Sequence, residues 1–409
     1  MSSNAYQNHK KELKYSKQSI NNAANLIRKG CTDQSSREES VKKIQNFREA
    51  HLYPLMLMKN HLVRTATKVD KKAIVARRLK RLDTIVDKLE RPTLDGKSEN
   101  SIKLTRMQDI GGCRAIVKDL NKLKELQKKL IASRSVHQIV KVQDYLNPKK
   151  SGYGGVHLIY SCFENQSDKC PPNQYKKLKI EIQLRTQLQH AWATSLEMVD
   201  LLNGFNLKTS MVGNEDWREF FSLAGRMVAF DQGAIELTPV EEYSLRAQLM
   251  IAQERNNALA HLARATLALT SASDSKKTCK LPKNHTSNGM YLIKFWFNPD
   301  KSLNNSVEHF NSKRSDDALI ALEQSEADPN ITLSVLVSSE SVNLLRKAYP
   351  NYFGSSKEFI AFIKSQIKKY LDTTTLEGNC LTTPHCSITL NDSELDAQLA
   401  LLTSLNSRL

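Results

Sequence analysis

The sequence predicts an α+β protein in which helices flank a mixed β-sheet, with a helical N-terminal region and a separate small α/β domain near the C-terminus. Apolar residues recur at helical spacing over residues 1–90, and an interruption is expected at residues 31–39. Short β-branched runs then alternate with helical segments between residues 107 and 199, which is typical of an α/β or α+β unit. The same alternation returns over residues 290–371.

These changes along the chain define the expected regions and elements. The regions are a helical region at residues 1–44, a central domain at 45–205, a helical extension at 206–272, a linker at 273–289, the small α/β domain at 290–371 and a tail with a short helix at 372–409. In the central domain, strands are expected at 115–117, 156–160 and 178–184, and helices at 120–133 and 187–202. Further along, a helix is expected at 241–270 behind a cap at Thr238, strands at 290–297 and 331–337, and helices at 316–326, 341–348, 356–369 and 393–404.

The small domain is expected to regulate the chain or to bind an unknown protein partner. Its composition is near neutral and it lacks an obvious set of catalytic groups. The aromatic residues at 349–353 belong either to its contact surface or to its core. A chain ending near Ala272 is therefore expected to keep the activity of the central domain.

Composition excludes several classes of protein. Of the 409 residues, 40% are apolar and 25% are charged, which is typical of soluble globular chains. No stretch approaches the roughly 18 consecutive apolar residues of a membrane helix, and the N-terminus lacks an apolar signal core. We therefore expect a cytoplasmic protein without a membrane partner. The seven cysteines are scattered and never spaced as CxxC, which indicates neither a disulfide framework nor a structural zinc site.

The positive charge is confined to the first half of the chain. Residues 1–200 carry a net charge of +19, whereas residues 201–409 carry −2. This excess indicates a polyanionic partner such as nucleotide phosphates or nucleic acid, although a solvated lysine-rich face is the alternative.

A basic segment at residues 76–89 is the first candidate for phosphate binding. If it is helical from Thr84 onward, Lys80, Thr84 and Lys88 share one face, and Thr84 could form a capping box with Asp87. Together with Arg78, these cations beside a helix N-terminus suit a triphosphate. A solvated basic face is the alternative.

Residues 107–117 combine an acid, two glycines and an arginine ahead of a buried strand. Asp109 can hold a hard cation, the glycines let backbone approach a ligand, and Arg114 can bind phosphate. A tight turn before a strand would explain the glycines equally well.

A basic loop leads into the strand expected at residues 156–160. An extended stretch would place Tyr153, Gly155 and His157 on one face, where Tyr153 could stack on a base and His157 could hydrogen-bond. Lys149 and Lys150 would then lie near phosphates. Core or rim positions are the alternative for the two rings.

Apolar and polar residues alternate strictly over residues 178–186. Glu181, Gln183 and Arg185 project together from the polar face of this strand, opposite a core face. An ordinary solvated strand with a Glu–Arg salt bridge would show the same pattern.

The four segments, taken in this order, resemble the synthetase domain of the RelA/SpoT family over about residues 45–205. The family pattern R-x-K-x-x-x-S-I-x-x-K-L is similar to Arg78, Lys80, Thr84, Ile85, Lys88 and Leu89, with Thr in place of Ser. The pattern D-x-x-G-x-R is similar to Asp109, Gly112 and Arg114. The basic loop with N-G-Y-x-x-x-H is similar to Lys149, Ser151, Gly152, Tyr153 and His157. The pattern E-x-Q-x-R-T followed by H-x-W-A is similar to Glu181, Gln183, Arg185, Thr186, His190, Trp192 and Ala193. The chain departs from the pattern at Gly154 and Gly155, after the loop tyrosine.

This resemblance implies a nucleotidyltransferase-like fold and a GTP diphosphokinase activity, in which the β,γ-diphosphate of ATP moves to the 3′-hydroxyl of GTP or GDP to give (p)ppGpp and AMP. It assigns ATP binding to Arg78, Lys80, Thr84, Lys88 and Arg114, catalysis and Mg²⁺ to Asp109 and Glu181, and acceptor binding to Lys149, Ser151, Tyr153, His157, Gln183 and Arg185. The long bifunctional members of the family carry a hydrolase domain with an adjacent His-Asp pair ahead of the synthetase domain. This chain has no His-Asp dipeptide, and the roughly 70 residues before its first motif are too few for that domain, so the resemblance implies no hydrolase activity.

Two other functions stay open at this point. The surplus of positive charge and the changed loop after Tyr153 favour a toxin-like member that acts on an adenine nucleotide or on the 3′ end of tRNA. A non-catalytic nucleotide-binding regulator is the second alternative, which intact Asp109 and Glu181 disfavour. The sequence also leaves homo-oligomer formation open.

Overall fold

The structure is a computed structural model that describes residues 9–30, 33–90, 102–166, 174–203, 207, 214–263, 289–299, 303–311, 314–339 and 356–377. The chain forms two compact units that alternate along the sequence. Unit 1 is drawn from residues 1–144, 155–187 and 274–349. Unit 2 is drawn from residues 145–154, 188–273 and 350–409.

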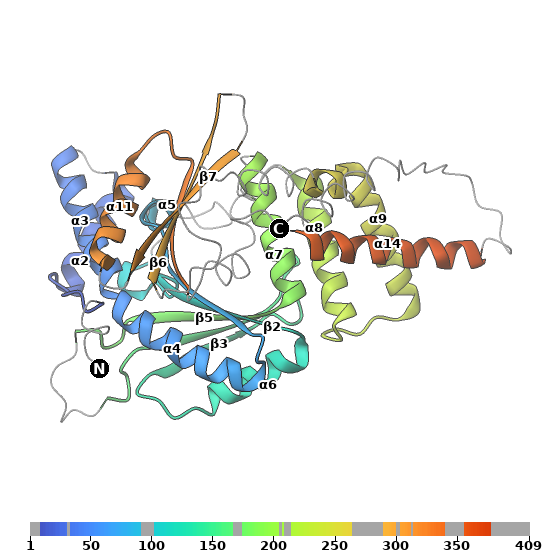
Figure 1. Ribbon diagram of the computed structural model, residues 1–409, viewed down its shortest axis with the longest axis horizontal. Helices are drawn as coiled ribbons and strands as arrows, with labels where there is room; N and C mark the ends of the chain where they lie inside the picture. Colours follow the sequence, from blue (N-terminus) through green and yellow to red (C-terminus); the bar gives the residue numbers. More distant parts are fainter. Residues whose placement is uncertain are drawn as a thin grey trace. The chain divides into compact units, whose positions relative to one another are not determined.

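An eight-stranded mixed sheet forms the centre of unit 1 within the described residues (Figure 1). Its strands are β1 (Ile74–Leu79), β2 (Gly111–Val117), β3 (Gln138–Asp144), β4 (Val156–Ser161), β5 (Lys179–Thr186), β6 (Gly289–Phe297), β7 (Leu303–Asn311) and β8 (Leu333–Ser339). They lie in the order β3-β4-β5-β2-β1-β8-β6-β7. The pair β2–β5 is parallel and the other described pairs are antiparallel, so the predicted α+β class with a mixed sheet is confirmed.

The helices of unit 1 confirm the predicted helical N-terminal region. They are α2 (Lys17–Lys29), α3 (Gln34–Ala50), α4 (Leu52–Val69), α5 (Leu82–Glu90), α6 (Leu120–Ile131) and α11 (Ser315–Ala327), with a 3₁₀ turn η1 (Leu104–Arg106). Helices α4 and α6 pack against β1, β2 and β5 (Figure 1). In α4, Leu55, Met58 and Leu62 recur at helical spacing and are fully buried, so burial of this apolar stripe holds the helix on the sheet.

Unit 2 is helical, with α7 (Gln187–Asn203), α8 (Glu215–Asp231), α9 (Pro239–Asn256) and α14 (Lys357–Glu377). The rings of Phe220, Phe221 and Phe359 lie 5.3–6.2 Å apart and form part of its core. The predicted cap at Thr238 is confirmed, since its side chain and that of Glu241 form a reciprocal capping box. The helix expected at 241–270 differs, because α9 ends at Asn256 and its C-cap residue, Asn257, adopts the left-handed conformation.

Three strands lie where the sequence analysis did not predict them. Strand β1 falls inside the stretch expected to be mostly helical, where its pairing with β2 and β8 overrides helical periodicity. Strands β3 and β7 lie at the two edges of the sheet. Their mixed sequences, QIVKVQD and LNNSVEHFN, lack the buried alternation that identifies inner strands.

The structure also differs from the separate C-terminal domain that the sequence predicts. Strands β6, β7 and β8 extend the central sheet, because β8 pairs with β1 at Arg77↔Ser338 and Arg78↔Val337. Helix α14 belongs to unit 2. The apolar pattern of a strand shows that it needs a partner but not which strand that partner is, and here the partner is the open edge of β1. The linker at 273–288 and the segments at 341–348, 349–353 and 393–404 lie outside the described residues.

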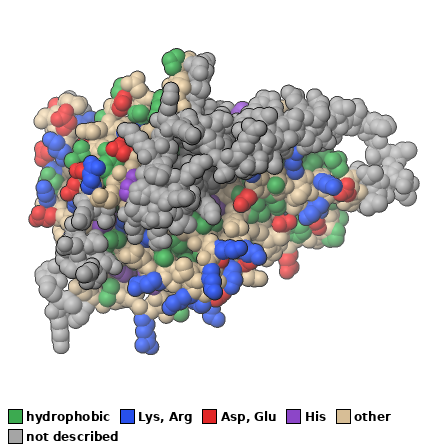
Figure 2. Space-filling view, viewed as in Figure 1, with side chains coloured by type: hydrophobic (Ala, Val, Ile, Leu, Met, Phe, Trp, Pro, Cys, Tyr) green, Lys and Arg blue, Asp and Glu red, His purple; other side chains and the backbone are tan. Residues whose placement is uncertain are grey.

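Lys and Arg side chains gather at the lower edge of the face drawn in Figure 2. Helix α6 lies in this part of unit 1, and its Lys124, Lys128 and Lys129 are exposed (Figure 1). The two cysteines that the structure describes as free, Cys113 and Cys162, are buried. No helix in the described part of the chain is both long and apolar enough to cross a membrane.

Candidate active site

Strands β1, β2, β4 and β5 bring the polar residues of four sequence segments onto one face of the sheet. In the register, Gly112 lies beside both Arg78 and Glu181, and Gln183 lies beside both Arg114 and His157. Cross-strand neighbours project to the same side of a sheet, so these side chains converge. All of these residues except His157 line one cavity, together with Lys80, Asp109 and Cys113.

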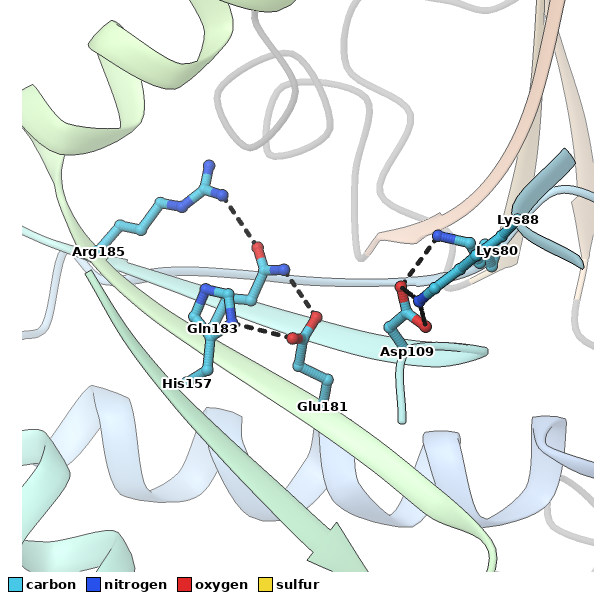
Figure 3. Close-up of polar contacts among 7 residues, drawn as sticks. All are labelled: Lys80, Lys88, Asp109, His157, Glu181, Gln183 and Arg185. Atoms are coloured by element: carbon cyan, nitrogen blue, oxygen red, sulfur yellow. Dashed lines mark hydrogen bonds and ion pairs between the residues drawn. The ribbon is translucent and has the colours of Figure 1, made fainter. Parts of the chain in front are cut away.

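Asp109 binds two lysines at one side of this cavity (Figure 3). Its Oδ2 lies 2.9 Å from Nζ of Lys80, and its Oδ1 lies 2.9 Å from Nζ of Lys88. Lys80 follows β1 and Lys88 lies on α5, so the carboxylate ties the end of the strand to the helix. All three side chains are largely buried, at 16–27% exposure, which makes this cluster stronger than a surface ion pair.

The two ammonium groups keep Asp109 ionised. Burial opposes its ionisation, but the charges and hydrogen bonds of Lys80 and Lys88 outweigh burial and lower the pKa to about 2. Since this pKa is below its value in an unfolded chain, the stabilisation is present above the ordinary range of an aspartate and is lost as the pH falls towards 2. The carboxylate is thus charged at neutral pH.

Glu181 lies at the centre of a second polar cluster (Figure 3). Its Oε1 is 2.9 Å from Nδ1 of His157, and its Oε2 accepts a 2.7 Å hydrogen bond from Nε2 of Gln183. Arg185 donates from Nη2 to Oε1 of Gln183 at 3.1 Å, which continues the chain of contacts along β5. Burial raises the pKa of Glu181, but the contacts with His157 and Gln183 outweigh burial and lower the pKa below its usual range. Glu181 is therefore a buried, ionised carboxylate whose two oxygens are fixed in direction.

Of the remaining residues assigned to ATP, the two arginines line the cavity and the threonine does not. Arg78 and Arg114 line the same cavity as the carboxylates, and Arg114 is 7% exposed. Thr84 lies within α5 and is not among the residues that line the cavity. The capping box suggested for Thr84 and Asp87 is wrong, because α5 begins at Leu82 and Thr84 is already inside the first turn.

The loop Tyr145–Gly154 in unit 2 brings Lys149 and Tyr153 together. The ammonium group of Lys149 lies 3.9 Å from the ring centroid of Tyr145 and 5.7 Å from that of Tyr153. Tyr153 also makes an edge contact with Trp192 at 6.2 Å. The strand face expected for Tyr153 is wrong, because β4 begins only at Val156, and Ser151 is exposed at the tip of the loop.

Two glycines hold this loop against α8. Gly152 has a φ of +85°, and a Cβ there would lie 2.3 Å from the carbonyl oxygen of Phe221. A Cβ on Gly225 would lie 2.0 Å from the carbonyl oxygen of Gly152. Ser222 donates from Oγ to the carbonyl of Lys150 at 2.7 Å. The loop therefore makes backbone-to-backbone contact that no larger residue permits at either glycine.

Two residues near these clusters were missed by the sequence analysis. Tyr145 forms a ring pair with Tyr153 at 5.9 Å, and the aromatic and basic composition of its loop could have identified it. Arg48 donates from Nε to the carbonyl of Lys80 at 2.7 Å. Nothing in the amphipathic pattern around Arg48 distinguishes it from other basic residues of α3, so only the structure identifies this contact.

Residues 77–198 match the model of the region found in RelA / SpoT proteins. We call residues 77–198 the RelA/SpoT region, after the family model that they match. It contains the second half of β1, all of β2 to β5 and both carboxylate clusters, whereas α3, β6, β7, β8 and α11 lie outside it.

Several solved structures are similar to about half of this chain. Small alarmone synthetase 1 from Bacillus subtilis bound to its product pppGpp is 23% identical, with 44% of this chain and 88% of that chain covered and a TM-score of 0.35. Small alarmone synthetase 2 from Bacillus subtilis is 21% identical, with coverages of 46% and 92% and a TM-score of 0.35. A GTP pyrophosphokinase family protein from Streptococcus pneumoniae is 20% identical, with coverages of 50% and 96% and a TM-score of 0.35. The search of curated proteins gave no match.

Proposed function

We propose that the RelA/SpoT region is a pyrophosphokinase that transfers the β,γ-diphosphate of ATP to the 3′-hydroxyl of GTP or GDP, with release of AMP. The observation that carries this proposal is that two ionised carboxylates line one cavity and have different neighbours. Asp109 is held by two lysines, and Glu181 is held by His157 and Gln183. A surface that only binds phosphate needs the cations, whereas the two carboxylates would repel the phosphate.

The donor nucleotide would bind at the Asp109 side of the cavity. Lys80, Lys88, Arg78 and Arg114 supply the positive charge that a triphosphate chain needs, and all but Lys88 line the cavity. Phosphate oxygens would compete with Asp109 for the two ammonium groups, which lie within 3.2 Å of its oxygens. Neutralising the chain and holding it in line with the attacking hydroxyl lowers the barrier to transfer.

Asp109 and Glu181 are also suited to a magnesium ion. Mg²⁺ is bound in proteins through one or two carboxylates together with substrate phosphates, and both carboxylates line this cavity. When bound, such an ion would neutralise developing charge on the phosphate oxygens. No group of three or more His, Cys, Asp or Glu side chains in the described part of the chain could hold a metal alone, which agrees with a site that the substrate completes.

Glu181 would act on the acceptor. Its ionised carboxylate can accept the proton of the 3′-hydroxyl, while His157 and Gln183 keep its oxygens in place. Arg185 would support Gln183 through the 3.1 Å hydrogen bond. In unit 2, Tyr153 would stack on the acceptor base, and Lys149 and Ser151 would bind acceptor phosphates or ribose.

A second acceptor class is favoured by one observation in the loop of unit 2. A Cβ at position 154 would lie 3.3 Å from Nε2 of Gln189. Because Gly154 has no side chain, this space beside the Gln189 amide is unfilled by residue 154. An altered pocket wall could admit an adenine nucleotide or the 3′ end of tRNA in place of a guanine nucleotide.

The test is the release of AMP from labelled ATP by the pure full-length chain with GTP, GDP, ATP or deacylated tRNA. AMP formed with GTP or GDP supports the proposal, and AMP formed only with ATP or tRNA supports the second acceptor class. Binding of ATP without AMP release for any acceptor would indicate a non-catalytic regulator. Incubation of purified ppGpp with the chain should leave the product intact, since we propose synthesis without hydrolysis.

Tyr153→Ala should mainly raise the KM for the acceptor. The substitution removes base stacking, which is worth roughly 1–3 kcal/mol, and it leaves the cations around Asp109 unchanged. Steady-state kinetics with each substrate varied in turn would check this. Tyr243→Ala, a change of an exposed tyrosine on α9, is the control. Loss of ATP binding with retained acceptor binding would reverse the placement of the two substrates.

Gly225→Ala should displace the loop that carries Lys149 and Tyr153. The new methyl group would lie 2.0 Å from the Gly152 carbonyl oxygen, so the loop must shift, and we expect the acceptor KM to rise about tenfold. Val240→Ala on α9, where the side chain is 78% exposed, is the control. Equal effects of the two variants on the acceptor KM would show that the contact between the glycines does not position the loop.

A further inference from the structure

Trp192 on α7 contacts both the loop Tyr145–Gly154 and α8, the helix against which this loop packs. The side chain is 3% exposed, and its ring centroid lies 6.2 Å from that of Tyr153 and 5.9 Å from that of Phe221. The interplanar angles are 67° and 88°, so both contacts have the edge-to-face geometry that aromatic rings prefer. Trp192 therefore joins the tyrosine of the loop to the aromatic core of unit 2.

The indole N–H of Trp192 reaches the backbone atom of α8 that the loop touches. Its Nε1 donates to the carbonyl oxygen of Phe221 at 2.9 Å in a buried hydrogen bond. A Cβ at position 152 would lie 2.3 Å from the same oxygen, so Gly152 lies against this atom. Because a hydrogen bond fixes distance and direction, the indole holds the part of α8 on which the loop rests. Tryptophan combines a large apolar ring with a donor at its rim, and Phe lacks that donor.

The loop packs closely around this contact. Trp192 contributes the largest side chain to the lining of a hollow that Gly152, Gly154 and Gly225 also line. Within the loop, the N–H of Lys149 donates to the carbonyl of Tyr153 at 3.1 Å, and the N–H of Gly152 donates to the carbonyl of Lys149 at 2.8 Å. A loop that is closed by its own backbone bonds moves as one piece, so a change at Trp192 should displace the tyrosine with it.

We propose that Trp192 is a positioning residue for the acceptor nucleotide. It acts through Tyr153, because the ring contact sets the direction of the tyrosine and the bond to Phe221 keeps the support of the loop in place. The inference rests on the proposed function in taking Tyr153 as the side chain that stacks on the acceptor base. It gives a role to a residue that the sequence resemblance matched without assigning it to either substrate.

The experiment is a double-mutant cycle in the full-length chain. The KM for GTP and the KM for ATP are measured for wild type, Trp192→Phe, Tyr153→Ala and the double variant. Trp192→Phe keeps a ring in the hollow but removes the N–H, so it should raise the KM for GTP about fivefold and leave the KM for ATP within about twofold. In the Tyr153→Ala background the same substitution should change the KM for GTP by less than about twofold, because a residue that acts through Tyr153 has nothing left to position.

Trp217→Phe is the matched control. Trp217 lies on α8 and contacts the same Phe221 ring at 6.0 Å, and its other described ring contacts are with Phe220 and His261. This substitution should leave the KM for GTP within about twofold. Additive effects in the cycle, an equal rise in the KM for ATP, or an equal effect of Trp217→Phe would overturn the proposal.

Amide hydrogen exchange tests the same role without nucleotide. The N–H groups of Lys149 and Gly152 are hydrogen-bonded within the loop, so residues 145–154 should exchange faster in Trp192→Phe than in Trp217→Phe or wild type. Unchanged exchange would overturn the proposal. Faster exchange in a protein that releases no AMP would support the positioning of the loop by Trp192 while refuting the pyrophosphokinase activity.

A further measurement keeps Trp192 in place, in case Trp192→Phe does not fold. The chain has three tryptophans, so Trp192 is the single one in a Trp217→Phe, Trp296→Phe double variant. Its fluorescence should change when GTP is added at a concentration that saturates AMP formation, because the base then contacts the neighbouring Tyr153. Unchanged fluorescence under these conditions would contradict the contact between Trp192 and the acceptor-binding ring.

Discussion

Asp109→Asn and Glu181→Gln should each lower turnover by about two orders of magnitude or more, since each removes a carboxylate that acts on the metal or on the attacking hydroxyl. Both substitutions keep the size of the side chain, and each site retains its neighbouring donors. We expect the loss in the chemical step of folded protein, although Asp109→Asn should also lower the unfolding free energy because Lys80 and Lys88 lose their counter-charge. Initial rates of AMP formation, measured together with thermal unfolding, would test both variants.

Binding of an ATP analogue distinguishes the role of the carboxylates from that of the cations around them. Asp109→Asn leaves Lys80 and Lys88 without their counter-charge, so an ATP analogue should bind the variant at least as tightly without magnesium as it binds the wild type. Asp87→Asn on α5 and Glu164→Gln after β4 are matched controls, because neither residue lines the cavity. Near-normal AMP formation by Asp109→Asn or Glu181→Gln would contradict the assignment of that carboxylate.

A chain ending at Ala272 should be inactive, in contrast to the expectation from the sequence. The truncation removes β8, the neighbour of β1, and it removes Met290 and Leu336, which lie with Leu55 and Leu79 around one hollow in unit 1. It also removes Phe359 from the core of unit 2. Each large buried side chain lost costs about 2–5 kcal/mol, and a domain is stable by only about 5–15 kcal/mol, so we expect no cooperative unfolding transition.

A point substitution tests the same contact with the chain intact. Leu336→Ala should destabilise the protein by about 2–5 kcal/mol, because its side chain is 4% exposed and leaves a cavity beside β1. Ile320→Ala on α11, where the side chain is 53% exposed, should change the unfolding free energy by less than about 0.5 kcal/mol. Denaturant unfolding would measure both. A folded and active chain ending at Ala272 would show that the C-terminal strands are dispensable.

The sequence by itself predicted which carboxylates and cations form the candidate site. Glu181, Gln183 and Arg185 alternate with buried apolar residues, and a period of two leaves them no arrangement other than one shared face. Asp109 and Arg114 are separated by glycines at the start of a strand, which likewise limits where they can point. Such local periodicity is enough to predict which side chains project from the sheet on the same face.

Only the tertiary structure decided which distant segments complete this site. The contact of Arg48 with the Lys80 carbonyl spans 32 residues, and no local pattern encodes it. The pairing of β8 with β1 depends on which open sheet edge a strand meets, because backbone hydrogen bonds are the same for every sequence.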